Sequence, residues 1–211
     1  MKIKINKEII LSTICCFIPT ILCIFVYDQL PGSLPIHFDA SGNPDGYVSK
    51  EIFIFVMPFV YAALNLLVNV FINNDPKRKN ASKVIFTLSK WIIPILTILF
   101  CFISILSALY ENINTSTFVL ALMGLVFIII GNYLPKCKQN YTMGVKLPWT
   151  LNSEENWNKT HRLSGFIWVI AGIIQIASAF FRLPQAVFLT SVAVMVIVPI
   201  AYSFILYKKG I

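Results

Sequence analysis

Four ionisable side chains within residues 28–51 are the most accessible chemistry that the sequence offers. His37, Asp39 and Asp45 lie among turn-forming residues, and Lys50 follows closely, in LPGSLPIHFDASGNPDGYVSK. An imidazole, two carboxylates and an ammonium group can all form charge-assisted hydrogen bonds. We therefore predict that this segment is a surface loop that presents these four residues to a ligand.

A calcium site is an alternative use of the same segment. Asp39, Ser41, Asn43 and Asp45 place oxygen atoms at alternate positions, as the ligands of a calcium loop do. The position where such a loop needs glycine holds Pro44, however, and the closing glutamate is absent. A structural turn is the simpler interpretation, in which the Pro-Asp-Gly triplet forms the turn and its glycine is left-handed. No bound metal or cofactor is expected.

A second informative segment, residues 131–165, is rich in aromatic and polar side chains. Asn152 and Glu155 have the spacing of a capping box, which predicts that a helix begins there. Trp157 and His161 are four residues apart and would share one face of that helix, which leads directly into an apolar run.

The tryptophans of this segment leave two interpretations open. Trp149 and Trp157 would anchor the segment at lipid headgroups, or they would form a docking face for a cytosolic partner. We interpret His161 as a hydrogen-bonded interfacial residue and not as a metal ligand, because no cysteine or acidic cluster completes a coordination shell near it.

The elements that must position both segments are membrane helices. The composition is 57% hydrophobic and only 12% charged, and the mean hydropathy is +0.78. The apolar residues form runs of about twenty, which is the length that crosses a bilayer as a helix. We predict an all-α bundle of about six spans, with the N-terminal run retained as the first span: 9–27, 52–72, 91–110, 118–134, 163–181 and 186–207.

The distribution of basic residues predicts the orientation. Of the 17 Lys and Arg residues, all except Lys50 and Arg182 fall at the two ends of the chain, between the second and third spans or between the fourth and fifth spans. Basic loops are retained in the cytoplasm, so both termini should be cytoplasmic and residues 28–51 should lie outside. The net charge of +8 is then explained by contact with anionic membrane lipid, and no direct nucleic-acid partner is expected.

Both segments resemble sequence signatures of the SdpI family of bacterial membrane immunity proteins, together with the membrane module that often precedes the SdpI domain. The first segment is similar to that N-terminal module at His37, Phe38, Gly42, Pro44, Asp45, Gly46 and Lys50. The second is similar to the SdpI signature at Gly131, Asn132, Pro135, Asn140, Gly144, Pro148, Trp149, Thr150, Leu151, Glu154, Trp157, Lys159, Thr160, His161, Arg162 and Gly165. One departure is Lys146-Leu147, where the family pattern has arginine and threonine.

The resemblance implies a multi-pass protein of the bacterial cell membrane that protects its producer against a secreted peptide toxin. Some members also act as a receptor that recruits a cytosolic transcriptional repressor, which is an optional partner here. The implied organisation is an N-terminal membrane module at 1–73 with its outer loop at 28–51, a basic cytoplasmic loop and third span at 74–116, and an SdpI-like domain at 117–211 with its cytoplasmic loop at 135–162.

Two other classes of function are weaker alternatives. A small transporter or channel would need polar groups within the spans, and Asn65, Asn69 and Gln175 could line a path. The same side chains could instead join helices by hydrogen bonds, which we consider the better interpretation. An enzyme would need a nucleophile, base or metal set gathered in one place, and the sequence shows none, so we expect no enzymatic activity.

Overall fold

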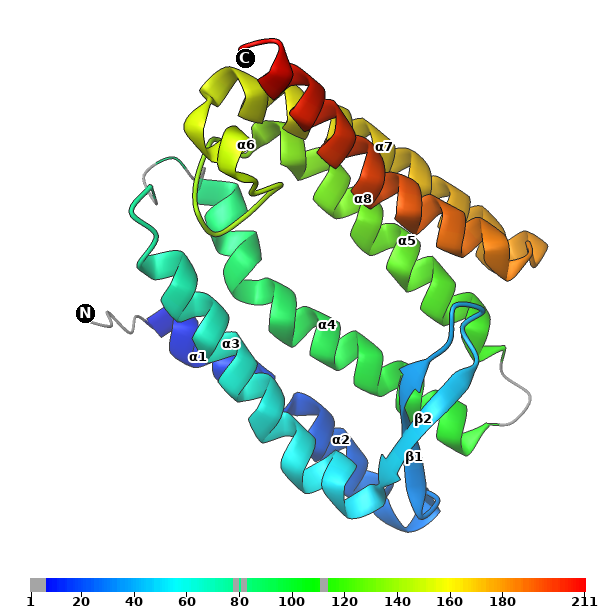
Figure 1. Cartoon of the computed structure of the whole chain (residues 1–211). Coiled ribbons are helices and arrows are strands. Elements are labelled where there is room, and N and C mark those ends of the chain that lie inside the picture. The colour runs from blue at the N-terminus through cyan, green and yellow to red at the C-terminus, as the bar shows by residue number, and fades with distance from the viewer. Residues whose placement is uncertain (1–6, 78–79, 81–82, 111–113) are drawn as a thin grey trace. The chain divides into compact units, whose positions relative to one another are not determined.

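The computed structural model describes residues 7–77, 80, 83–110 and 114–211. Lys2, Lys4, Arg78 and Lys79, which were counted in the orientation argument, lie outside the described residues. The chain forms two compact units (Figure 1). Residues 1–74 and 86–116 make up the first unit, and residues 75–85 and 117–211 make up the second.

The described part of the chain is nearly all helical, and six of its segments are long and apolar enough to cross a membrane. Large apolar side chains stay exposed on them; Phe71 and Ile197 are each 62% exposed. Such surfaces suit contact with lipid tails and not with water. The prediction of about six spans is confirmed, with these bounds: Lys7–Phe25, Ile52–Asn73, Phe86–Leu109, Thr115–Lys136, Glu154–Phe181 and Gln185–Lys208.

Prolines interrupt two of the segments in the first unit. The first segment is two helices, α1 (Lys7–Cys15) and α2 (Ile18–Phe25), and Pro19 stands in the first turn of α2. Pro58 is the second residue of α3 (Met57–Asn73), which follows a π-helical turn, and it has no N–H to offer the carbonyl of Ile54. The Thr20 hydroxyl donates to that carbonyl at 3.2 Å, so α2 satisfies the group that Pro58 leaves open.

Residues 33–49 form a β-hairpin where the sequence predicted only a turned loop. Strand β1 (Ser33–Phe38) pairs antiparallel with β2 (Pro44–Ser49), as Figure 1 shows. The turn that joins them is at residues 39–43, and Gly42 is the left-handed residue, with φ of +83°. The predicted Pro-Asp-Gly turn is therefore wrong, because that triplet opens β2.

The hairpin is fixed to the core of the first unit. Leu34 of β1 is fully buried among apolar residues of the neighbouring helices, which are Cys23, Phe53, Ile54, Cys101 and Ile105. At the tip, a side chain at position 42 would meet the Cα of Ser116 at 2.7 Å, so only glycine allows this close approach. The helix α4 (Lys83–Leu109) contributes Phe100, whose ring packs edge to face with Phe38 of β1.

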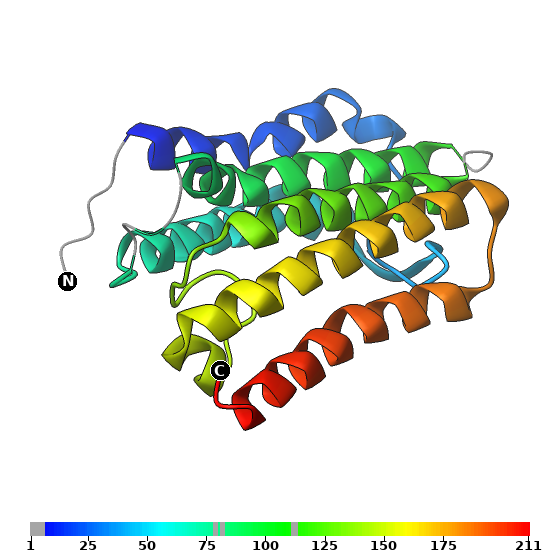
Figure 2. The same cartoon turned by 90° about the horizontal axis from the view of Figure 1, so that it is seen from above.

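Close helix contacts build the second unit, whose main helices are α5 (Thr115–Tyr133), α6 (Pro148–Asn152), α7 (Glu154–Phe181) and α8 (Gln185–Lys208). Helices α7 and α8 run side by side, as Figures 1 and 2 show. Gly124 and Gly131 of α5 face Gly172 and Gly165 of α7, and each glycine leaves room for the backbone carbonyl opposite. Small residues of this kind let membrane helices approach closely.

Candidate functional site

Asp39 organises the hairpin turn and is not free for a ligand in the way the sequence suggested. Its Oδ1 accepts hydrogen bonds from the backbone N–H groups of Ser41 and Asn43, at 2.8 and 2.9 Å. These bonds stabilise the carboxylate, and they hold the pKa of Asp39 below its ordinary value, the bond from Asn43 contributing most. One of the two carboxylate oxygens that Asp39 could offer to calcium is thus already bonded within the turn.

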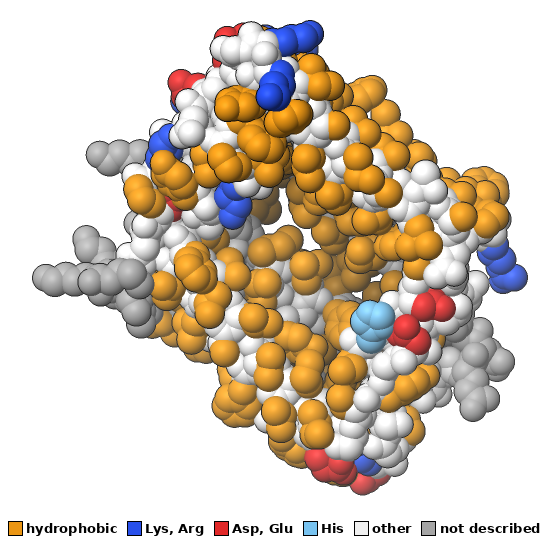
Figure 3. Space-filling view, in the orientation of Figure 1, with side chains coloured by type: hydrophobic (Ala, Val, Ile, Leu, Met, Phe, Trp, Pro, Cys, Tyr) orange, Lys and Arg blue, Asp and Glu red, His pale blue; other side chains and the backbone are white. Residues whose placement is uncertain are grey.

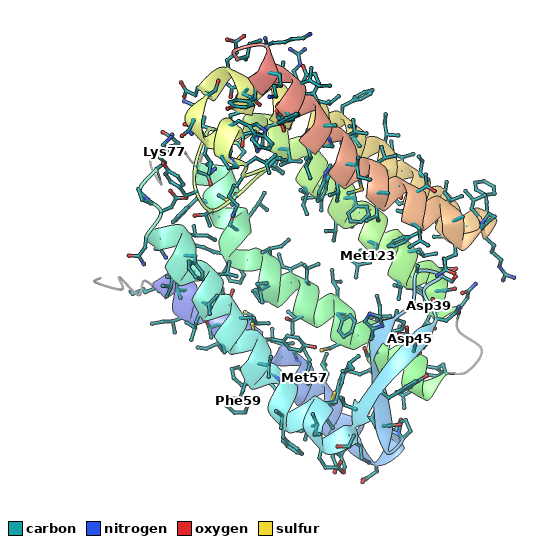
Figure 4. The ribbon with its side chains drawn as sticks, in the orientation of Figure 1. Asp39, Asp45, Met57, Phe59, Lys77 and Met123 are labelled. Carbon is teal, nitrogen blue, oxygen red and sulfur yellow. The ribbon has the colours of Figure 1, made fainter. Side chains whose placement is uncertain are left out.

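His37 and Asp45 form an exposed pair on the hairpin. His37 Nδ1 donates to Asp45 Oδ1 at 2.5 Å, and the two side chains are 70% and 46% exposed. Figure 3 shows histidine and acidic side chains together on the surface over the hairpin, and Figure 4 places Asp39 and Asp45 there. Since the pair is already oriented, a ligand would meet a carboxylate and the second ring nitrogen in a fixed geometry.

Lys50 supports the base of the hairpin. Its ammonium group donates to the carbonyls of Tyr27 and Leu30 at 3.1 and 3.3 Å, and it lies 4.2 Å from the centre of the Tyr27 ring. Of the four residues predicted to bind a ligand, Asp39 and Lys50 therefore hold the hairpin in shape, whereas His37 and Asp45 are presented on its surface.

In the second unit, Trp157 and His161 form the buried centre of the loop that joins α5 to α7. Both are fully buried, and their rings stack with 3.9 Å between centroids. His161 donates from Nδ1 to the carbonyl of Trp157 and accepts the N–H of Val145 at Nε2, so the ring is neutral. A side chain at Gly144, which has φ of +110°, would stand 2.2 Å from His161 Nε2.

This burial excludes both sequence interpretations of Trp157, the headgroup anchor and the docking face. Trp157 donates to the carbonyl of Cys137 at 2.7 Å and does not reach the surface, so the prediction that it anchors the segment in lipid headgroups is wrong. The predicted shared face of Trp157 and His161 is confirmed by their stacking. His161 is a hydrogen-bonded residue as expected, but it is interior and not interfacial.

Asn140 and Thr150 fold the loop around that centre. Asn140 Oδ1 accepts the backbone N–H groups of Thr142 and Met143, while its amide donates to Lys138 and to the sulfur of Cys137. Burial raises the pKa of Cys137, which therefore stays a neutral thiol. The Thr150 hydroxyl bonds the carbonyls of Val145 and Leu147 and accepts the Leu147 N–H, which closes the first turn of α6.

Ser203 of α8 connects the loop to the last helix. Trp149 donates its indole N–H to the Ser203 hydroxyl at 2.9 Å and stacks on Tyr207. Asn156 donates to the Ser203 carbonyl at 3.0 Å and to an oxygen of Ile211 at 3.1 Å. Sequence reasoning singled out Trp149 but missed Asn156 and Ser203, which look like ordinary helix residues until the fold pairs them.

The helix start was predicted one residue too early. The N-cap of α7 is Ser153, whose hydroxyl accepts the N–H of Asn156 at 3.1 Å, whereas Asn152 ends α6. The predicted capping box of Asn152 and Glu155 is therefore wrong. The prediction that this stretch is helical and continues into the fifth span is confirmed, because α7 is unbroken from Glu154 to Phe181.

Asp75, Lys77 and Asn80 form hydrogen bonds with the same loop, which the sequence did not reveal. Asp75 accepts the backbone N–H of Tyr141 at 2.9 Å and the hydroxyl of Thr142 at 2.5 Å. Lys77, marked in Figure 4, donates to the Gln139 side chain, and Asn80 donates to the Gln139 carbonyl. Gln139 in turn donates to the carbonyls of Thr150 and Leu151, both at 2.9 Å.

Five of the predicted partner-binding residues are exposed in the second unit. Asn132 and Arg162 lie on the surfaces of α5 and α7, Pro135 follows α5, Pro148 begins α6, and Gly144 lies in the loop between them. Although it is exposed, Pro135 also packs against Gly165, where its ring would clash with any added side chain. The signature therefore contains mostly structural residues, and its surface members are the ones that another molecule could reach.

Polar residues within the spans serve helix packing. Asn65 of α3 donates to the hydroxyls of Ser12 and Thr13 of α1, at 3.1 and 3.0 Å. Gln175 of α7 donates to Ser191 of α8 at 2.5 Å. For these two residues the packing interpretation is confirmed. The third, Asn69, donates to the backbone carbonyl and the side-chain oxygen of Asn65 within α3.

The six apolar helices and the two structured loops define a multi-pass helical protein of the cell membrane. Residues 136–203 match the SdpI/YfhL protein family, and residues 14–61 match a domain of unknown function, DUF1648. These matches confirm the predicted resemblance to the SdpI family with its preceding membrane module. The chain is also 29% identical over 206 residues to the immunity protein SdpI of Bacillus subtilis (strain 168), covering 96% of this chain and 97% of that protein. No solved structure matches it.

Proposed function

We propose that this protein is a membrane immunity protein that gives a bacterium resistance to a secreted peptide toxin. The observation that carries the proposal is the similarity to the immunity protein SdpI, which extends over almost the full length of both chains. A similarity of that extent includes both the hairpin and the α5–α7 loop, so the comparison is not limited to one shared span.

The hairpin is the surface we assign to the toxin. The orientation predicted from the basic residues places residues 28–51 outside the cell, where a secreted peptide arrives. His37 and Asp45 are exposed and already oriented by their mutual hydrogen bond. A preformed polar pair loses little conformational entropy when it binds, which favours recognition.

The α5–α7 loop is assigned to the cytoplasmic side, where its main role is to hold the second unit together. Its exposed basic residues are Lys136, Lys138 and Lys146, and Lys159 and Arg162 are exposed in the first turns of α7. They provide a surface for anionic lipid headgroups or, as an optional second role, for a cytosolic repressor.

The proposal is tested by challenging a sensitive bacterium, with and without this gene, with a toxin-producing strain and with its purified secreted peptide. Survival that depends on the gene supports immunity. The matched variants are His37→Ala with Asp45→Ala in the hairpin, compared with Arg162→Ala on the other side. If cells that carry the wild-type protein at normal membrane levels survive no better than cells without the gene, the proposed function is refuted.

A further inference from the structure

The register of the hairpin decides which backbone groups point away from it. The pairs Ser33 with Ser49, Leu34 with Val48 and Pro35 with Tyr47 lie opposite one another, and the N–H of Lys50 donates to the carbonyl of Gly32. Hydrogen-bonded and non-hydrogen-bonded pairs alternate in an antiparallel ladder. The pair of Leu34 and Val48 is therefore hydrogen-bonded, and its two neighbouring pairs direct their backbone groups outward.

The two outer edges of the hairpin are not equivalent. On β1, Pro35 occupies an outward position and has no N–H, which blocks that edge to further pairing. On β2, Tyr47 directs both its N–H and its C=O outward, and Ser49 directs its N–H outward, whereas the Ser49 C=O lies at the start of the helical turn that begins at Lys50. Both side chains are exposed, Tyr47 to 57%. The edge of β2 is thus open to one more strand.

The charge around this edge is opposite to that of the chain as a whole. The protein carries a net charge of +8, yet residues 28–51 hold four of its nine acidic residues: Asp28, Asp39, Asp45 and Glu51. The segment has one lysine, Lys50, whose ammonium group is held by backbone carbonyls. Asp45 is exposed on β2 itself, two residues before Tyr47. A strand that added here would be favoured by basic side chains.

We propose that the edge of β2 binds an extended, basic peptide segment as a third strand, through backbone hydrogen bonds at Tyr47 and Ser49 and charge attraction to Asp45. Strand addition to a free sheet edge is a general mode of peptide recognition. The inference rests on the proposed function in one respect, since it identifies the binding mode for the secreted peptide. The binding itself is measured without any toxin.

The first arm of the test uses synthetic peptides and the full-length protein in nanodiscs of zwitterionic lipid. The probes are a short labelled peptide of alternating Lys and Val, its Glu and Val counterpart, and a Lys and Val peptide that is N-methylated at alternate residues. Fluorescence anisotropy should show binding of the first probe only. Equal binding of the N-methylated peptide would overturn the inference, because that peptide keeps the charge but cannot pair along its backbone.

The second arm changes the protein. Tyr47→Pro removes an outward N–H without breaking a hydrogen bond inside the hairpin, and Tyr47→Phe is the matched control that keeps the backbone. We expect Tyr47→Pro to weaken binding of the Lys and Val peptide about tenfold, as the loss of one to two hydrogen bonds implies. Tyr47→Phe should bind as the wild type does. Equal affinity of a folded Tyr47→Pro variant would also overturn the inference.

Survival assays separate this inference from the proposed function. If the wild type protects cells and Tyr47→Pro protects them equally well, immunity stands and strand addition fails. If the wild type binds the Lys and Val peptide as described but gives no protection, the edge site stands and the immunity proposal fails.

Discussion

Gly172 is the position where a single methyl group should disturb the second unit most predictably. A Cβ at Gly172 would lie 2.5 Å from the carbonyl oxygen of Gly124, whereas ordinary contact begins at 3.4 Å. Because both groups belong to helix backbones, α5 and α7 would have to separate by about 0.9 Å, the difference between those distances. Overpacking of this kind costs about 1–3 kcal/mol, so Gly172→Ala should lower the free energy of unfolding by that amount.

The assay is unfolding by increasing fractions of sodium dodecyl sulfate in mixed micelles, followed by tryptophan fluorescence. Gly32→Ala is the matched control, because nothing lies within 4 Å of the Cβ that it adds. We expect a lower midpoint for Gly172→Ala and an unchanged midpoint for the control. Identical midpoints for Gly172→Ala and the wild type would refute the reasoning that this helix crossing has no room for a methyl group.

The remaining predictions concern single contacts. Gly144→Ala places a methyl group against His161 at a residue whose backbone is left-handed, so it should prevent the loop from folding. Increased quenching of tryptophan fluorescence by acrylamide would show this. His161→Phe leaves the backbone N–H that the ring accepts unpaired, and it should cost about 1–3 kcal/mol in the same unfolding assay. The pKa of Asp39 is lower in the folded protein, so its carboxylate stabilises the hairpin fully above the ordinary value of 3.8, and this stabilisation is lost as the pH falls through the folded value. Asp39→Asn should abolish that acid dependence, which an NMR titration of the hairpin amides measures. Glu8→Gln should destabilise the protein more than Lys90→Met does. The reason is that the Lys90 side chain is only 3% exposed and would be left charged without its partner, whereas the Glu8 side chain is 54% exposed. Equal midpoints of the two variants in the unfolding assay would contradict this.

The helices were predictable from sequence because lipid imposes one requirement on every span. A run of apolar residues long enough to cross the bilayer must satisfy its backbone internally, and a helix does so regardless of side-chain detail. Six runs therefore predicted six helices. The break before Pro19 and the π-helical turn before Pro58 depend on how particular helices pack, so only their approximate positions could be anticipated.

The hairpin and the loop were less predictable because long-range pairing decides them. Prolines and glycines near Asp45 suggested turns, but Pro44 is compatible with β2 because its position needs no N–H toward β1. Trp157 has the residue type of an interfacial anchor, and only the fold shows that its indole N–H is used by the Cys137 carbonyl. Asp75 and Gln139 gave no signal, since their bonds, to Tyr141 and to Lys77, join segments more than sixty residues apart along the chain.

A dose–response curve for the purified secreted peptide on sensitive cells tests the immunity function itself. The cells carry the wild-type gene, an empty vector or the variant with His37→Ala and Asp45→Ala, each checked for membrane levels. We expect the wild type to raise the inhibitory peptide concentration well above that of the vector, and the double variant to lose most of this gain. Curves that coincide for the wild type and the vector would contradict an immunity function.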